Sequence, residues 1–222
     1  MTSAMTSEDV RTRIEEIGII PAVRVPSVED ALFAAQAVLR GGIGVVEMTM
    51  TIPGAFDAIT ELRRTSPGLM VGAGTVMDLD TARHCLDAGA AFLTSPSLDI
   101  EMLEFGAMQN ALVIPGVLTP TEVVTASRAG AALIKIFPCA QLGGPSYIKA
   151  LKAPFPRINL IASGGVNQQT ARDFLRAGAA ALGVGESLIP LDAVQRRKAD
   201  WIRELCGRFL SVIKEVRAIG KH

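Results

Sequence analysis

The five residues RAGAA occur at 128–132 and again at 176–180, and DAGAA occurs at 87–91. RGGIG at 40–44 is a looser copy of the same phrase. Each copy follows a stretch with a helical pattern and precedes a short apolar run. Glycine ends helices because it adopts the left-handed backbone conformation at no steric cost. The phrase therefore predicts a helix that stops and turns directly into a strand, repeated along the chain.

Extending outward from these joints gives a regular series of elements. The predicted strands are short, rich in valine, isoleucine and leucine, and mostly not alternating, which is typical of parallel strands covered on both faces. They span 19–25, 44–50, 69–76, 91–97, 111–117, 132–138, 159–166 and 180–186. The predicted helices span 29–40, 55–65, 79–88, 99–109, 121–129, 145–153, 168–177 and 192–217.

Eight strands and eight helices in strict alternation, with about 28 residues per unit, predict an α/β fold of the (β/α)₈ type, a TIM barrel. An open doubly wound sheet has the same alternation. Eight similar units, and no GxGxxG after the first strand, favour the barrel. We expect one domain over residues 1–222, with a core from about 17 to 190 and a last helix at 192–217.

Composition argues against several classes of protein. Twenty-two basic residues balance 22 acidic ones and the pI is near 6.7, which argues against nucleic-acid binding. No apolar run reaches the ~18–20 residues of a membrane helix, and the first sixteen residues lack the apolar segment of a signal peptide. Three widely spaced cysteines fit a reducing cytoplasm, and two histidines are too few for a multi-histidine metal site. We expect a cytoplasmic protein without a metal, a nucleic-acid partner or a membrane partner.

Two charged residues lie inside otherwise apolar strands. Glu47 lies in GVVEMTM (44–50) and Lys135 lies in ALIKIFP (132–138). We expect both to point into the barrel or its mouth, where barrels carry their chemistry. A structural ion pair is the plain alternative, because buried charges need partners. Charges held in a cleft are, however, enriched at functional sites.

A lysine in an apolar site has a specific chemical use. Apolar surroundings disfavour an ammonium ion, and a neutral amine attacks ketones to form a Schiff base. The protonated imine is an electron sink that permits deprotonation of the adjacent carbon or cleavage of a C–C bond. A carboxylate such as Glu47 can carry the proton. Lys135 and Glu47 therefore predict a class I aldolase or a related Schiff-base lyase that needs no cofactor.

Other polar residues gather at the C-terminal ends of the predicted strands, where they either face a substrate or cap the next helix. For Thr49, Thr94 and Ser95 a helix cap is at least as good a prediction as a function. A glycine-rich turn after the seventh strand is a common phosphate site in barrels. The remaining candidates are Arg24, Thr51, Thr75, Pro96, the turn Ser163-Gly164-Gly165, Glu186 and Ser187.

Taken together, these motifs resemble the KDPG aldolase family (2-keto-3-deoxy-6-phosphogluconate aldolase, which also acts as 4-hydroxy-2-oxoglutarate aldolase). The resemblance extends from about Ile19 to Pro190. It is carried in order by IIPAVR, VVEMTMTIPGA, GAGTV, TSPS, IPGV, IKIFP, GPSYIKAL and SGGV. It implies a (β/α)₈ barrel that assembles as a homotrimer. It also implies reversible cleavage of a 2-keto-4-hydroxy acid to pyruvate and an aldehyde.

The resemblance also implies a role for each matching residue. Lys135 would form the Schiff base with pyruvate, and Glu47 would be the general acid and base, acting through a water. The other matches would bind the substrate: Thr75 and Pro96 around pyruvate, Phe137 beside the lysine, Ser163 at the aldehyde, where it influences stereochemistry, and Gly164 and Gly165 at a phosphate.

Two positions depart from the family pattern. Many members have an arginine four residues after the glutamate, where this chain has Thr51, and Arg24 on the neighbouring first strand is the expected substitute. The usual serine after the last GxG is replaced by Glu186, with Ser187 one place later. A carboxylate beside a phosphate dianion is repulsive. KDPG, which gives glyceraldehyde 3-phosphate, is the first expected substrate. 4-Hydroxy-2-oxoglutarate, which gives glyoxylate, is the second, and Glu186 strengthens the case for it because this substrate carries no phosphate.

Two further functions remain open from the sequence. Decarboxylation of oxaloacetate uses the same pyruvate imine. A phosphate-binding barrel that is not a lyase, such as an isomerase or an inactive binding scaffold, would share the fold and the glycine-rich turn but not the need for Lys135.

Overall fold

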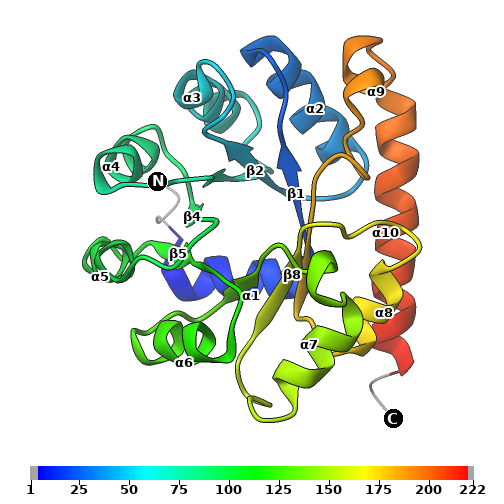
Figure 1. Ribbon diagram of the computed structural model, residues 1–222. Coiled ribbons are helices and arrows are strands. Elements are labelled where there is room, and N and C mark those ends of the chain that lie inside the picture. Colours follow the sequence, from blue (N-terminus) through cyan, green and yellow to red (C-terminus); the bar gives the residue numbers. More distant parts are fainter. Residues whose placement is uncertain (1–4, 220–222) are drawn as a thin grey trace.

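A computed structural model describes residues 5–219 as a ring of parallel strands enclosed by helices (Figure 1). All eight predicted strands are present, each shorter than predicted or divided, because the strand ends turn early into the loops that lead to the helices. The strands are β1 (Ile19–Val23), β2 (Val45–Thr49), β3 (Met70–Gly74), β4 (Phe92–Thr94), β5 (Leu112–Ile114), β6 (Gly116–Val117), β7 (Ile134–Ile136), β8 (Leu160–Ser163) and β9 (Ala181–Val184).

The ring closes through the fifth predicted strand. The strand order is β5-β4-β3-β2-β1-β9-β8-β7-β6, and β5 and β6 are consecutive in the chain, separated only by Pro115. β5 pairs with β4, whereas β6 pairs with β7. Pro115 has no N–H to donate, but its carbonyl accepts a hydrogen bond of 2.9 Å from the Lys135 amide. The closed ring confirms the predicted barrel over an open sheet.

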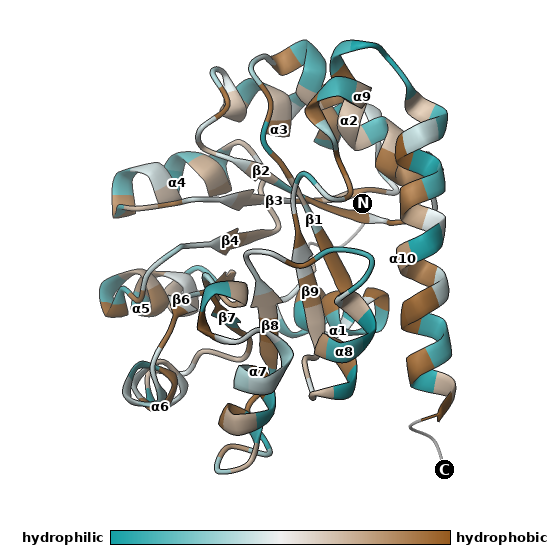
Figure 2. Cartoon of the chain, turned by 45° about the vertical axis from the view of Figure 1, so that its right-hand side comes forward, coloured by the Kyte–Doolittle hydropathy of each residue, from teal (hydrophilic) through white to brown (hydrophobic). Residues whose placement is uncertain are grey.

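The helices form the outer layer, with apolar faces toward the strands and polar faces outward (Figure 2). Several begin at a side-chain cap: the side chains of Ser27, Asp99 and Thr119 each accept a hydrogen bond from a backbone N–H of the first turn. The helices are α1 (Ser7–Ile17), α2 (Val28–Arg40), α3 (Ala55–Thr65), α4 (Leu79–Asp87), α5 (Ile100–Met108), α6 (Pro120–Arg128), α7 (Pro145–Lys152), α8 (Ala171–Arg176), α9 (Leu191–Gln195) and α10 (Ala199–Ile219), with a 3₁₀ turn, η1 (Ala140–Leu142), after β7.

The repeated glycine phrase forms the predicted helix-to-strand joints. Gly89, Gly130 and Gly178 have φ of 99°, 91° and 102°, the left-handed region. The amide that follows each glycine bonds back to the carbonyl five residues earlier, as in Ala131 N–H to Ala126 O at 3.0 Å. This pattern is the Schellman ending of a helix. Asn110, with φ 50°, ends α5 in the same way without a glycine.

The prediction of one continuous helix over 192–217 is wrong, because the chain breaks between α9 and α10. Arg197 adopts a left-handed conformation, with φ 52°. Its guanidinium pairs with Glu29 at 2.7 Å and Asp30 at 2.6 Å, and it lies 5.0 Å from the centre of the Phe33 ring. These contacts with α2 stabilise the left-handed conformation of Arg197. Arginine rarely adopts this conformation, so the sequence alone does not indicate a helix break here.

Helix α1 was not expected from the sequence. Thr6 and Asp9 form a reciprocal capping box at its start, and Val10 and Ile14, one turn apart, are buried. The helix contacts β1, β5 and β9 and lies behind the strands in Figure 1. Because α1 leads directly into the start of β1, it covers the N-terminal ends of the strands. The C-terminal ends are the face available for a site.

The described residues bear on two predictions about the chain as a whole. Between residues 5 and 219, no helix combines the length and the apolar character needed to cross a bilayer. Residues 1–4 and 220–222 lie outside the described residues, so the prediction of one domain over 1–222 stays a prediction.

Candidate active site

Glu47 and Lys135 line the same small cavity inside the ring of strands. Glu47 on β2 is 5% exposed, and Lys135 on β7 is partly buried. The cavity has a volume of about 20 Å³ and is also lined by Thr94 and Ser163. A space of this size holds about one water molecule. Both charged side chains therefore face the barrel interior, not the helix-covered outside.

The two charges do not neutralise each other. No ion pair formed within residues 5–219 includes Glu47 or Lys135. The Lys135 Nζ lies 5.3 Å from the centre of the Phe137 ring, in cation–π range. The site is thus not a structural ion pair. The amine and the carboxylate are both directed at the cavity.

The Glu47 carboxylate is held by residues from two other strands. Thr94 Oγ1 on β4 donates a hydrogen bond of 2.7 Å to Glu47 Oε2. Gly74, on the intervening β3, leaves room for this reach, because a Cβ there would overlap the carboxylate. A helix cap was an expected role for Thr94, and this is wrong: its hydroxyl points inward to Glu47. Forty-seven residues separate the partners, so no local sequence signal links them.

Lys135 is fixed by its place in the sheet. It lies opposite Gly116 on one side and Ile161 on the other. A Cβ on Gly116 would overlap the backbone of Pro96, so this glycine brings Pro96 close to the neighbouring strand. Phe137 therefore lies beside the lysine at the end of the same strand, and Pro96 packs against the neighbouring strand at Gly116.

Thr75 follows Gly74 and has φ 61°, a conformation that is uncommon for a residue with a branched side chain. Strained backbone of this kind persists only where its surroundings fix it, and it clusters at functional sites. The GAGTV motif is therefore more than an ordinary tight turn. Gly74 admits the carboxylate, and Thr75 turns the chain at the rim of the cavity.

Arg24 and Thr51 lie at the exposed ends of β1 and β2. The two strands pair in parallel, with Ala22 opposite Glu47, which brings both strand ends to the same part of the rim. Thr51 Oγ1 lies 2.8 Å from Thr49 Oγ1, so its hydroxyl is already hydrogen-bonded. Arg24 belongs to none of the ion pairs within residues 5–219, which leaves its charge available to an anion.

The SGGV turn closes the other side of the mouth. Gly164 and Gly165 have φ of 85° and 83°. A Cβ on Gly164 would lie 3.0 Å from Pro138 Cα, and one on Gly165 would overlap Ala140. Both glycines are therefore required, because side chains would strain the backbone and collide with the turn after β7. Ser163, only 9% exposed, directs its hydroxyl toward the cavity beside Gly183.

Glu186 and Ser187 follow β9 and are both exposed. Neither lines the cavity of Glu47 and Lys135. Glu186 belongs to no ion pair within the described part of the chain, so no protein cation offsets its charge. The structure thus brings Glu47, Lys135 and Ser163 together at the centre and leaves Glu186 and Ser187 on the outer rim.

Comparisons with known proteins agree with this geometry. Residues 10–205 match the family model for KDPG and KHG aldolases. The chain is 32% identical to a 2-dehydro-3-deoxy-phosphogluconate aldolase of Pseudomonas aeruginosa, over 86% of each chain. It is 30% identical to a KHG/KDPG aldolase of Escherichia coli, over 84% of this chain and 88% of that protein. Among solved structures it resembles KDPG aldolase from Legionella pneumophila with pyruvate captured at low pH as a covalent carbinolamine intermediate. That match has a TM-score of 0.80 at 31% identity and covers 91% of this chain and 97% of that one.

Proposed function

The chain belongs to the KDPG and KHG aldolase family and is a lyase, and from that premise we propose that it works through a Schiff base on Lys135. One observation carries the proposal. The amino group of Lys135 and the carboxylate of Glu47 line a single small cavity without pairing with each other. An amine and a carboxylate so arranged are free to act on a third group between them.

The first half of the reaction joins substrate and enzyme. The neutral Nζ of Lys135 attacks the ketone carbon, C2, of a 2-keto-4-hydroxy acid to form a carbinolamine. Loss of water from the carbinolamine gives the protonated imine, with the proton supplied from the side of Glu47. The Phe137 ring lies beside the amine and gives it a partly apolar neighbour.

The second half breaks the C3–C4 bond. Glu47, through a water in the cavity, takes the proton of the C4 hydroxyl. The electron pair of the C3–C4 bond moves toward the imine nitrogen, so the aldehyde leaves and an enamine remains. Glu47 returns a proton to C3, and hydrolysis of the imine releases pyruvate and the free amine of Lys135.

The rim supplies substrate binding. We assign the pyruvate carboxylate to Arg24, near Thr51, and the pyruvate body to Thr75 and Pro96. Ser163 would contact the aldehyde portion. A phosphate would meet the backbone of Gly164 and Gly165, with Glu186 and Ser187 across the turn. We propose KDPG as the first substrate and 4-hydroxy-2-oxoglutarate as the second.

Reduction with borohydride in the presence of pyruvate tests the mechanism. Pyruvate should become attached to the peptide that contains Lys135, as a secondary amine measured by mass spectrometry. Release of an aldehyde together with pyruvate separates an aldolase from an oxaloacetate decarboxylase. Absence of an adduct on Lys135 would rule the mechanism out.

We also propose that the protein is a cytoplasmic homotrimer. The family resemblance supports the trimer, and three free, buried cysteines support a reducing compartment. Sedimentation equilibrium at micromolar protein tests the assembly, because a monomer mass of 23.4 kDa is easily told from a trimer.

A further inference from the structure

The hydrogen bond from Thr94 to Glu47 joins two buried side chains on strands that are not neighbours. Thr94 is 1% exposed, and its hydroxyl reaches the carboxylate of a residue two strands away in the ring. Within residues 5–219 this is the only hydrogen bond to the Glu47 carboxylate, and it uses Oε2 alone. Oε1, on the side of Gly74, receives no hydrogen bond from the described part of the chain.

The same cavity offers Glu47 a competing partner. Lys135 faces the carboxylate across a space of about 20 Å³. A glutamate side chain free to rotate would turn toward an ammonium ion, because opposite charges attract strongly where water is scarce. Such an ion pair would make both the Glu47 carboxylate and the Lys135 amine unavailable to the substrate. The Thr94 hydroxyl holds Oε2 on the β4 side of the cavity and so opposes this collapse.

We propose that Thr94 is a positioning residue for proton transfer by Glu47, an inference that rests on the proposed function. In the step concerned, the carboxylate of Glu47 takes a proton from the methyl carbon of the pyruvate imine. The C–H electron pair becomes the C=C bond of the enamine, and the iminium nitrogen becomes neutral. Thr94 contributes by holding the carboxylate where it meets that carbon and not the lysine.

The Thr94→Val variant tests the role, because valine keeps the shape of threonine and loses only the hydroxyl. Exchange of the pyruvate methyl protons in D₂O, followed by NMR, reports the step. At saturating pyruvate the exchange rate should fall about tenfold, since a hydrogen bond to a charged group is lost. The KM for pyruvate should stay within about twofold. Thr94→Ser, which keeps the hydroxyl, should recover exchange to within about threefold of the wild type.

Repeating the Thr94→Val substitution in a Glu47→Asp variant separates a positioning effect of Thr94 from a packing effect. In Glu47→Asp the shorter carboxylate cannot reach Thr94, so adding Thr94→Val should cause no further loss of exchange. An equal loss in both backgrounds, or an equal loss for Thr94→Val and Thr94→Ser, would overturn the proposal, because the effect would then come from packing alone.

Borohydride trapping distinguishes the two levels of failure. A wild-type protein that traps no pyruvate would defeat the proposed function. A wild type that traps and exchanges pyruvate, with Thr94→Val exchanging just as fast, would defeat only the role of Thr94.

Discussion

The two sides of the barrel mouth differ in how tightly their residues are held. On the side of β2 and β4, Glu47 and Thr94 are buried and hydrogen-bonded to each other. On the side of β9, Glu186 and Ser187 are exposed and lie outside the cavity. The buried side cannot change without disturbing the packing of three strands. The exposed side can change at little structural cost. We therefore expect the buried side to keep the chemistry fixed and the exposed side to set which aldehyde is accepted.

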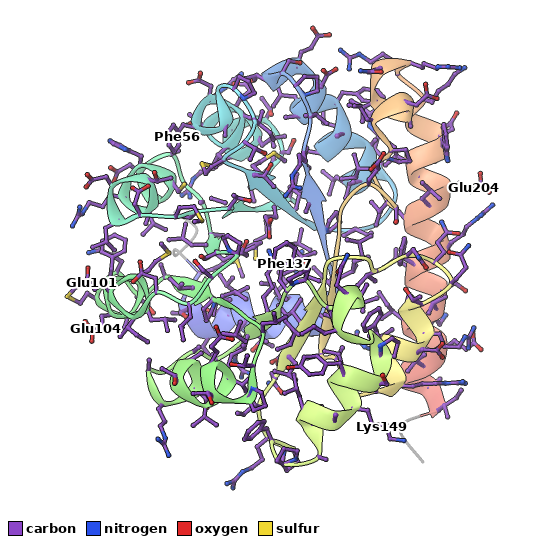
Figure 3. All side chains as sticks on the ribbon, viewed as in Figure 1. Phe56, Glu101, Glu104, Phe137, Lys149 and Glu204 are labelled. Carbon is purple, nitrogen blue, oxygen red and sulfur yellow. The ribbon has the colours of Figure 1, made fainter. Side chains whose placement is uncertain are left out.

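The largest expected effect comes from removing the amine. Lys135→Ala should lower kcat by a factor on the order of 10⁴ or more, because no other group in the cavity can form the imine. The folded protein should remain stable, since Lys135 takes part in no ion pair within residues 5–219. The measurement is the retro-aldol rate, alongside borohydride trapping. Lys149→Ala, on the outer face of α7 in Figure 3, is the matched control and should retain full activity.

The second effect tests the packing of the buried side. Gly74→Ala places a Cβ where the Glu47 carboxylate lies, so the carboxylate must move. We expect kcat to fall about 100-fold, the scale of an ångström-sized misplacement in a site. Stability should fall by about 1–3 kcal/mol from overpacking.

Gly68→Ala is the control, because a Cβ there meets no atom within 4 Å. Loss of activity is read from kcat, and stability from urea unfolding. Normal activity in Gly74→Ala would mean that the carboxylate position seen here is not the working one.

A smaller effect is expected at the exposed side. Glu186→Ser removes a carboxylate that no protein cation offsets within the described residues. The kcat/KM for KDPG should rise about five- to tenfold, whereas that for 4-hydroxy-2-oxoglutarate should change less than about twofold. Because exposed charges are screened by salt, the gain should shrink at high ionic strength.

Glu104→Ser, an exposed carboxylate on α5 (Figure 3), controls for net charge. Equal gains for both substrates would show that Glu186 acts on something other than the phosphate.

The regular part of the fold follows from the sequence because its signals are local. The glycine phrase marks four of the helix ends, and apolar runs mark the strands. Asn110 and Arg197 end helices with the same backbone geometry but without glycine, and the left-handed Arg197 is held by Glu29 and Asp30, which are distant in sequence. Helix α1 carries a local signal in Thr6 and Asp9, but its two buried side chains are too few to make an amphipathic pattern stand out.

The site residues also fall into those that local sequence signals indicate and those that they do not. Glu47 and Lys135 stand out because a charge inside an apolar strand is costly and needs a reason. Thr94 carries no such cost and is as acceptable in a strand as at a helix cap. Its partnership with Glu47 depends on strand order, on register and on the absence of a side chain at Gly74. Such a three-strand relation exists only once the barrel has closed.

The smallest expected effect concerns a second carboxylate in a turn of the mouth. Glu122, in the first turn of α6, accepts backbone hydrogen bonds from Thr119 at 2.7 Å and Leu118 at 2.9 Å. These bonds, that from Thr119 most of all, lower the pKa of Glu122 below the ordinary value for a glutamate. Unlike Glu186, this carboxylate is tied to the backbone through Oε2, so we expect it to stabilise the fold and not to bind substrate.

Glu122→Ala should therefore cost about 1 kcal/mol of unfolding free energy at pH 7, the scale of a lost helix cap. The kcat/KM for both substrates should stay within about twofold. Because the folded-state pKa is lowered, the contribution is present at neutral pH and is lost as the pH falls below about 4.5 and through the folded value. Urea unfolding at pH 7 and pH 3 measures this, and the variant should approach the wild type at pH 3. An unchanged difference at acid pH would show that the charge of Glu122 is not what stabilises the turn. A loss of activity would place this turn, with Glu186, among the residues that select the substrate.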